Sequence, residues 1–201
     1  MILKLSVEDY KKYWSNPRGN GSFTYVVLGD SAAQSIGASS PEKGYVGLIA
    51  KSIEERTGKQ VRIINLSQTG AKLDDVINRQ LAELEKNDSD LITVEIGSNE
   101  ISNYNPTEFR KKFEIIASRL PDDALVANIP YFGGRVKSND KAIDASRIIE
   151  EIVRKHELKL VDLQSETRSR HSIFNYAIDY FHPSDRGYRI WADAFLRKIE
   201  L

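Results

Sequence analysis

Cysteine is absent from this chain of 201 residues. Disulfide bonds, thiolate metal sites and cysteine nucleophiles are therefore excluded. A chain without disulfides is compatible with a reducing compartment. The first ten residues also lack the long apolar stretch and the small-residue cleavage site of a secretory signal. We therefore expect a cytoplasmic protein, and a trimmed secreted form remains the alternative.

Long apolar runs and an excess of one charge are absent as well. No segment approaches the ~20 apolar residues that a transmembrane helix requires, so we expect no membrane span. Lys+Arg and Asp+Glu are both 29, so the net charge is zero. This balance argues against binding to nucleic acid by phosphate neutralisation and against strong adsorption to anionic membranes. The length suits one domain with a single core.

Signals for bound cofactors are also missing. We find no repeats, no low-complexity linker and no His/Asp spacing typical of a metal site. Gly133-Gly134 is too short a signal for a phosphate-binding loop. None of the many carboxylates stands out as part of a glycosidase pair. We therefore expect neither a metal nor a cofactor.

The chain divides into a short arm, residues 1–22, and a domain, residues 23–201. Ser6-Val7-Glu8-Asp9 resembles a capping box that opens a short helix through about Trp14. Residues 16–21 are typical of a loop. One hypothesis for the arm is that it docks to a partner protein.

Strand and helix patterns alternate after residue 22. The apolar runs are continuous, as expected for strands covered on both faces. We expect strands near 23–29, 61–66, 91–97, 124–129 and 157–163, and helices near 41–57, 72–86, 107–119, 139–156 and 185–199. This alternation predicts an α/β fold: a five-stranded parallel sheet in a three-layer α/β/α sandwich. Ligands bind such sheets beyond the carboxyl ends of the strands.

Candidate catalytic residues lie at both ends of the domain. Ser31 follows the first expected strand within Gly29-Asp30-Ser31, where a turn can expose its hydroxyl. A serine needs a base and a group that orients the base before it becomes a good nucleophile. Asp179 precedes His182 by three residues on one loop. His182 could take the proton from Ser31 while Asp179 accepts the proton on Nδ1.

Two further strand ends carry candidate oxyanion donors. Gly70 follows the second expected strand, and Asn99 follows the third. Acyl transfer creates an oxyanion that requires hydrogen-bond donors, for which backbone N–H groups and a side-chain amide are suitable. The N–H groups of Ser31 and Gly70 and the amide of Asn99 would supply three. Glycine lacks a Cβ and lets substrate approach the backbone.

These four blocks resemble those of the SGNH hydrolase family, the GDSL-type esterases and lipases. The blocks fall in order on Ser31, Gly70, Asn99 and His182, and Asp179 stands at the acidic position. The resemblance covers the chain from about residue 23 and implies a flavodoxin-like strand order of 2-1-3-4-5. The chain departs from the pattern at two positions: Ala32 replaces leucine, and Glu100 replaces aspartate. Neither change removes a catalytic group.

Each candidate also has a structural interpretation. Ser31 could cap a following helix, Gly70 could end a strand, and Asn99 and Asp179 could stabilise turns. Asp30 could hydrogen-bond the turn or support another block, without a chemical role. The other histidines are His156, which we assign to a surface helix end, and His171, which lies on a charged loop without an orienting partner. Glu166, Arg168 and Arg170 are interpreted as a solvated charged face.

The segment Tyr131-Phe132-Gly133-Gly134-Arg135 follows the fourth expected strand. Tyr131 and Phe132 could bind substrate in an acyl or alcohol pocket; a flexible loop is the alternative. We therefore predict a serine hydrolase that cleaves small-molecule carboxylic esters through an acyl-enzyme. The substrate would be a small-acyl or carbohydrate ester. Lipid-ester or lysophospholipid hydrolysis, acyl transfer and a non-catalytic flavodoxin-like binding module remain alternatives. The sequence leaves the oligomeric state open.

Overall fold

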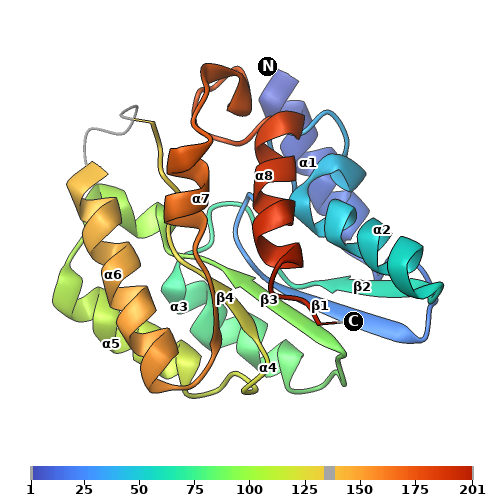
Figure 1. Ribbon diagram of the computed structural model, residues 1–201, viewed down its shortest axis with the longest axis horizontal. Coiled ribbons are helices and arrows are strands. Elements are labelled where there is room, and N and C mark those ends of the chain that lie inside the picture. The colour runs from blue at the N-terminus through green and yellow to red at the C-terminus, as the bar shows by residue number, and fades with distance from the viewer. Residues whose placement is uncertain (1, 134–138, 201) are drawn as a thin grey trace.

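The computed structural model describes residues 2–133 and 139–200, and side chains from residue 7 onward (Figure 1). A five-stranded sheet of order β2-β1-β3-β4-β5 forms its centre, and all strand pairs are parallel. The strands are β1 Phe23–Gly29, β2 Val61–Asn65, β3 Leu91–Glu95, β4 Leu125–Ala127 and β5 Lys159–Val161. The predicted fold class and strand order are confirmed.

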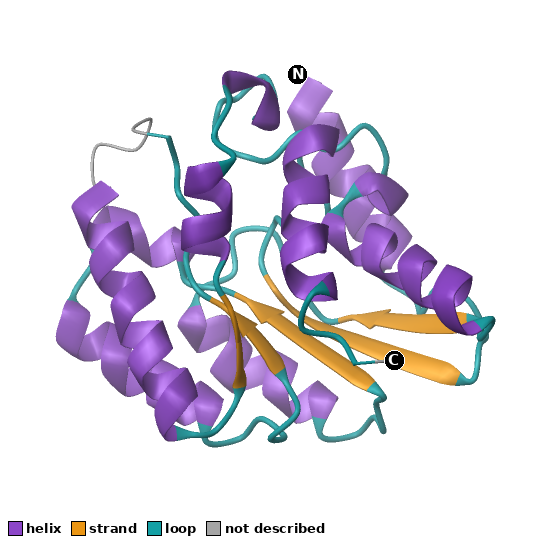
Figure 2. Ribbon diagram, viewed as in Figure 1, coloured by secondary structure: helices purple, strands orange, loops and turns teal. Residues whose placement is uncertain are grey.

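Helices cover both faces of the sheet and complete the three layers (Figure 2). The first face carries α1 Ile2–Trp14, α2 Tyr45–Thr57, α7 Leu163–Ser169 and α8 Asp185–Leu196. The second face carries α3 Leu73–Asp75, the π turn η2 Val76–Gln80, α4 Leu81–Leu84, α5 Pro106–Ala117 and α6 Asn139–Lys155. Short 3₁₀ turns are η1 Pro41–Lys43, η3 Ser98–Asn103 and η4 Ile173–Asn175.

The last helix illustrates how the sequence pattern becomes packing. Ser184 caps α8, and its side chain accepts a hydrogen bond from Gly187 N. Tyr188, Trp191 and Phe195 share one side of the helix and are buried on the sheet. Each large side chain buried in this way contributes about 1.5–3 kcal/mol. This packing holds the start of α8, and with it the preceding loop, above the carboxyl ends of the strands.

Some element boundaries differ from those predicted. The segment 72–86 is divided between α3, η2 and α4, and the helix near 41–57 is η1 followed by α2. A seven-residue helix, α7, occupies the region interpreted as a charged loop. Its N-cap is Asp162, whose carboxylate accepts a hydrogen bond from Ser165 N at 2.9 Å. An acidic cap three residues before a serine was therefore the signal that the prediction missed.

The N-terminal helix α1 begins at Ile2 and not at Ser6, so the predicted capping box does not set its start. The helix packs on the domain. Tyr10 Oη donates to Ala38 O at 2.8 Å, and Trp14 Nε1 donates to Gln34 O at 3.2 Å. The separation of residues 1–22 as an arm stays a prediction. Among the described residues, no helix combines the length and apolarity that crossing a membrane would need.

Candidate active site

Ser31 lies in a turn at the carboxyl end of β1, on the edge where the ends of β3 and β4 also lie. Its carbonyl accepts a hydrogen bond from Ile36 N at 3.0 Å. Residues 31–37 form turns, and the next helical segment begins only at Pro41. Ser31 is therefore not a helix cap. Its side chain is buried except for the part that faces a pocket shared with His182.

Ser31, His182 and Asp179 form one hydrogen-bonded chain. His182 Nε2 lies 3.0 Å from Ser31 Oγ, and His182 Nδ1 lies 2.5 Å from Asp179 Oδ2. These distances suit a nucleophile, a base and a group that orients the base. The sequence placed all three residues without showing how near they lie; the structure joins positions 151 residues apart.

A local turn orients Asp179 toward the imidazole. Its Oδ1 accepts hydrogen bonds from Phe181 N at 3.0 Å and His182 N at 3.1 Å, while Tyr180 adopts a φ of +58°. Burial by itself would raise the pKa of Asp179. The hydrogen bonds from the His182 ring and from these two N–H groups hold that pKa below its ordinary value. Asp179 therefore stays ionised and able to accept the Nδ1 proton.

Asp30 connects Ser31 to the candidate oxyanion residues. Its Oδ1 accepts from Ala32 N at 3.0 Å, and its Oδ2 accepts from the Asn99 amide at 3.1 Å. The carboxyl thus supports both the turn and another block, as one interpretation of the sequence proposed. The pKa of Asp30 is raised to about 7: burial is the main cause and the charge of Glu100 adds to it, while the hydrogen bond from Ala32 N opposes both.

Asn99 lies in η3 and contacts two neighbours through one nitrogen. Nδ2 donates to Asp30 Oδ2 at 3.1 Å and to Ala71 O at 2.9 Å. Both N–H bonds are therefore directed at protein acceptors, and an oxyanion would have to share one of them. Gly70 has a φ of +77°, and a Cβ at that position would meet nothing within 4 Å. The N–H groups of Ser31 and Gly70 donate no hydrogen bond within residues 2–133 and 139–200.

Three polar side chains to which the sequence assigned no structural role hold these loops. Gln34 accepts from Thr69 N at 3.0 Å and donates to Ser67 O at 3.0 Å, which holds the loop before Gly70. Gln80 Oε1 accepts from Gly29 N at 2.8 Å, and Gln80 Nε2 donates to Gly29 O at 2.9 Å.

The third side chain is Glu100. Its Oε1 accepts from Leu73 N at 2.8 Å, so the residue that departs from the family pattern holds the start of α3. No local sequence signal marks these residues, because their partners come from other strands and loops.

Glu95 is the last residue of β3 and pairs in register with Gly29. Its side chain is 1% exposed, and Oε2 has no hydrogen-bond partner in the described part of the chain. Burial, and next the charge of Asp30, raise the pKa of Glu95 well above its ordinary value; a hydrogen bond with Ser98 opposes this only in part. A second carboxyl group with a raised pKa therefore lines the same space as Ser31. An acid at the end of an otherwise apolar strand was the available sequence signal.

Two spaces adjoin at the mouth of the site. The first, about 280 Å³ including its open side, is bordered by Ser31, His182, Glu95 and Phe132, among others. The second measures about 350 Å³ and includes Tyr131 in its wall. Five residues line both spaces: Pro130, Phe132, Phe181, Pro183 and Trp191. Phe132 therefore reaches the space in front of Ser31, whereas Tyr131 reaches only the second. Gly134 and Arg135, which belonged to the same predicted segment, lie outside the described residues.

The remaining histidines take no part in the chain of hydrogen bonds at Ser31. His156 Nε2 lies 2.8 Å from Glu114 Oε2 at the end of α6. His171 packs edge-to-face on Tyr131, with ring centroids 5.4 Å apart. In the two described ranges, no cluster of three or more His, Asp or Glu side chains could hold a metal ion.

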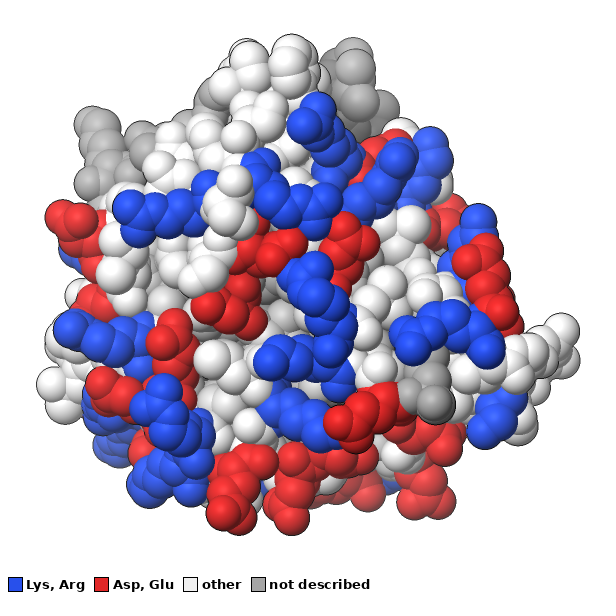
Figure 3. All heavy atoms as spheres, in the orientation of Figure 1, with Lys and Arg blue, Asp and Glu red and all other residues white. Residues whose placement is uncertain are grey.

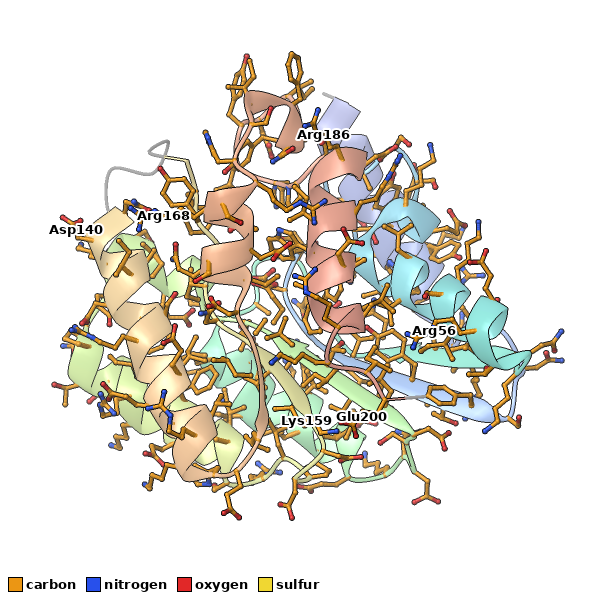
Figure 4. All side chains as sticks on the ribbon, viewed as in Figure 1. Arg56, Asp140, Lys159, Arg168, Arg186 and Glu200 are labelled. Carbon is orange, nitrogen blue, oxygen red and sulfur yellow. The ribbon has the colours of Figure 1, made fainter. Side chains whose placement is uncertain are left out.

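The surface near the site differs from the rest of the visible face. Acidic and basic side chains alternate over most of it, whereas the uppermost part is largely uncharged (Figure 3). Exposed apolar side chains, including Ile173, Phe174 and Ile178, belong to the segment between α7 and α8. Arg168 comes from α7 and Arg186 from the start of α8, on opposite sides of this segment (Figure 4).

A family model of the GDSL-like lipase/acylhydrolase family matches residues 27–190. The match includes Ser31, Gly70, Asn99, Asp179 and His182 and covers most of the chain. The fold and the hydrogen-bonded serine, histidine and aspartate define a serine hydrolase of the SGNH type. The chain belongs to the GDSL-like lipase/acylhydrolase family and is a carboxylic ester hydrolase.

Solved structures show the same fold at low identity. The acetylxylan esterase Axe2 from Geobacillus stearothermophilus is 19% identical with a TM-score of 0.74, covering 90% of this chain and 96% of its own. A lipase/acylhydrolase from Enterococcus faecalis is 21% identical with a TM-score of 0.75, covering 88% and 95%. LAE5, an alpha/beta hydrolase from the metagenome of Lake Arreo, is 19% identical with a TM-score of 0.73, covering 88% and 94%. No curated protein matches the chain in sequence.

Proposed function

We propose that this chain hydrolyses esters of short acyl groups, of the acetyl type, through a covalent acyl-enzyme on Ser31. The observation that carries the proposal is the hydrogen-bonded chain from Ser31 Oγ through His182 to Asp179, with distances of 3.0 and 2.5 Å. No other described histidine contacts a serine hydroxyl.

In the first half-reaction, Ser31 Oγ attacks the ester carbonyl carbon and His182 Nε2 takes the hydroxyl proton. Asp179 Oδ2 accepts the Nδ1 proton and stabilises the imidazolium. His182 then gives its proton to the leaving alcohol oxygen as the carbon–oxygen bond breaks. A water molecule repeats the sequence on the acyl-enzyme: His182 removes its proton, and Ser31 leaves as the restored hydroxyl.

The oxyanion would be held by the N–H groups of Ser31 and Gly70, which have no other acceptor within the described residues, and by the Asn99 amide. Since both Asn99 N–H bonds already have acceptors, binding of the oxyanion would weaken the bond to Asp30 or to Ala71. Asp30 tolerates this loss best when its carboxyl group is neutral, because the neutral acid needs fewer donors.

The limited space in front of Ser31 favours a short acyl group, and the acetylxylan esterase among the structural neighbours suggests an acetylated carbohydrate as one source. A lipid ester and acyl transfer to an alcohol are the competing candidates. The lipase/acylhydrolase neighbour and the exposed apolar side chains of residues 173–181 favour the lipid ester.

The test is hydrolysis of p-nitrophenyl acetate and p-nitrophenyl octanoate by the wild type and by Ser31→Ala, purified side by side. We expect the wild type to cleave the acetate faster and the variant to lose several orders of magnitude in kcat. Ser35→Ala is a matched control, since Ser35 Oγ donates to Pro41 O and does not contact His182. Equal rates in the wild type and Ser31→Ala would refute the mechanism. Faster cleavage of the octanoate would favour the lipid ester.

A further inference from the structure

Phe132 and Phe181 form a partition between the two spaces at the site. Their rings are stacked, with centroids 5.4 Å apart and an angle of 6° between the planes. Both residues line the space in front of Ser31, and both line the second space. On the Ser31 side of this pair lie Glu95 and His182, and on the far side lie Tyr131 and Tyr176.

The partition is held from both sides. Tyr131, next to Phe132, donates its N–H to Thr167 Oγ1 at 2.8 Å and accepts at its carbonyl from Tyr176 Oη at 3.0 Å. Phe181 N donates to Asp179 Oδ1 at 3.0 Å, and the Phe181 ring packs edge-to-face on His182 with centroids 5.1 Å apart. The stack is therefore anchored to α7 on one side and to the catalytic loop on the other.

The second space has the lining of an apolar binding pocket. Its wall is formed mainly by apolar and aromatic side chains, among them Ile190 and Trp191 from α8. Thr167 also lines it, and its hydroxyl donates to Leu163 O at 2.6 Å, so that donor is already satisfied. An alkyl chain that passed the partition would move from water into contact with these apolar side chains.

We propose that the Phe132–Phe181 stack sets the acyl-chain length of this esterase by closing the space in front of Ser31. This proposal rests on the proposed function, because it assumes an acyl-enzyme on Ser31. The acyl part stays attached to Ser31 after the alcohol leaves and is therefore suited to the closed side, whereas the alcohol must depart to solvent. Opening the partition would join the two spaces and admit longer acyl chains.

The test measures kcat/KM for p-nitrophenyl acetate, butyrate, hexanoate and octanoate with the wild type, Phe132→Ala and Phe181→Ala. We expect kcat/KM of the wild type to fall steeply with acyl length. In both variants the octanoate-to-acetate ratio should rise by about tenfold or more, since single methylene groups in an apolar pocket are discriminated by that order. Phe132→Trp enlarges the partition and should lower the butyrate-to-acetate ratio instead.

Phe174→Ala is the matched control. Phe174 is 69% exposed and lines neither space, so the ratios of this variant should equal those of the wild type. Thermal unfolding of each variant shows whether the fold is intact, and the acyl ratio is unaffected by a loss of activity that is common to all the esters. If Phe132→Ala lost its structure, Phe132→Trp and Phe181→Ala would decide the question.

Unchanged acyl ratios in folded, active variants would overturn the proposal and leave the serine mechanism intact. The proposal would also be overturned if the variants changed only the preference among acetate esters of different alcohols. The stack would then border the alcohol part of the substrate. Failure of the proposed function has a different signature: wild type and Ser31→Ala would show the same rates on every ester.

Discussion

Replacing Asp30 by asparagine tests whether the buried carboxyl group next to Ser31 destabilises the protein at neutral pH. Asp30 is 2% exposed, and burial raises its pKa from 3.8 to about 7. A folded-state pKa above the unfolded value means that the native state binds the proton more tightly. Stability is therefore lost as pH rises from about 4 to about 7, and little more is lost above that range.

The size of this loss follows from the shift. One pKa unit corresponds to about 1.4 kcal/mol, so a shift of about three units gives about 4 kcal/mol between pH 4 and pH 7. In Asp30→Asn this loss is absent, because the amide does not titrate. At pH 4 the amide keeps one oxygen as an acceptor but presents its NH2 group to the other donor, either Ala32 N or Asn99, which should cost about 1–2 kcal/mol.

The variant should therefore be less stable than the wild type near pH 4 and more stable above pH 7. Urea unfolding at several pH values, followed by the fluorescence of the buried Trp14 and Trp191, measures the difference. Glu95→Gln should also gain stability relative to the wild type as pH rises, because burial also raises the pKa of Glu95.

Asp185→Asn is a control for which the expected pH dependence of stability is opposite. Burial alone would raise the pKa of Asp185, but hydrogen bonds from Ser39 and Lys43 hold it below its ordinary value. The wild type therefore gains stability from Asp185 as pH rises, and the asparagine variant should fall further behind it. The reasoning would be refuted if the difference in unfolding free energy between the wild type and Asp30→Asn stayed constant from pH 4 to pH 8.

Two further substitutions test single polar groups. Asn99→Ala should lower kcat for p-nitrophenyl acetate by about a hundred- to a thousandfold with little change in KM, as expected for loss of one oxyanion donor. A larger change in KM than in kcat would assign Asn99 to substrate binding. Tyr45→Phe should raise the free energy of unfolding by about 1 kcal/mol without affecting kcat, because Tyr45 Oη is buried with no partner among the described residues. Urea unfolding measures this change, and a loss of stability would show that the hydroxyl is bonded after all.

The sheet could be predicted because its information is local. Continuous apolar runs separated by helix patterns give five covered strands, and the strand order came from the family resemblance rather than from spacing. Short polar features were harder. The start of α7 depends on one cap, Asp162, and the π turn at Val76–Gln80 is associated with two hydrogen bonds between Gln80 and Gly29. Those bonds depend on tertiary contacts that periodicity does not report.

The candidate site likewise contains residues that the sequence predicts and residues that it does not. Ser31, Asp179 and His182 follow from residue type and position, and the structure joins them. The position of Phe181 does not follow, since its role depends on the ring of Phe132, which is 49 residues away in the chain and stacked on it in space. The pairing of Glu95 with Gly29 likewise requires the register between β1 and β3.

Two buried acids lower the stability of the fold at this edge of the sheet. Asp30 and Glu95 lie at adjacent strand ends. The charge of Asp30 adds to burial in raising the pKa of Glu95, and Glu95 Oε2 has no partner in the described chain. An apolar pair at these positions would be more stable but could not hold the Asn99 amide. Since Asp30 orients Asn99 and bonds the turn that carries Ser31, we infer that the loss of stability is retained because it positions the nucleophile and an oxyanion donor together. The Asp30→Asn variant should therefore gain stability above pH 7 while losing esterase activity.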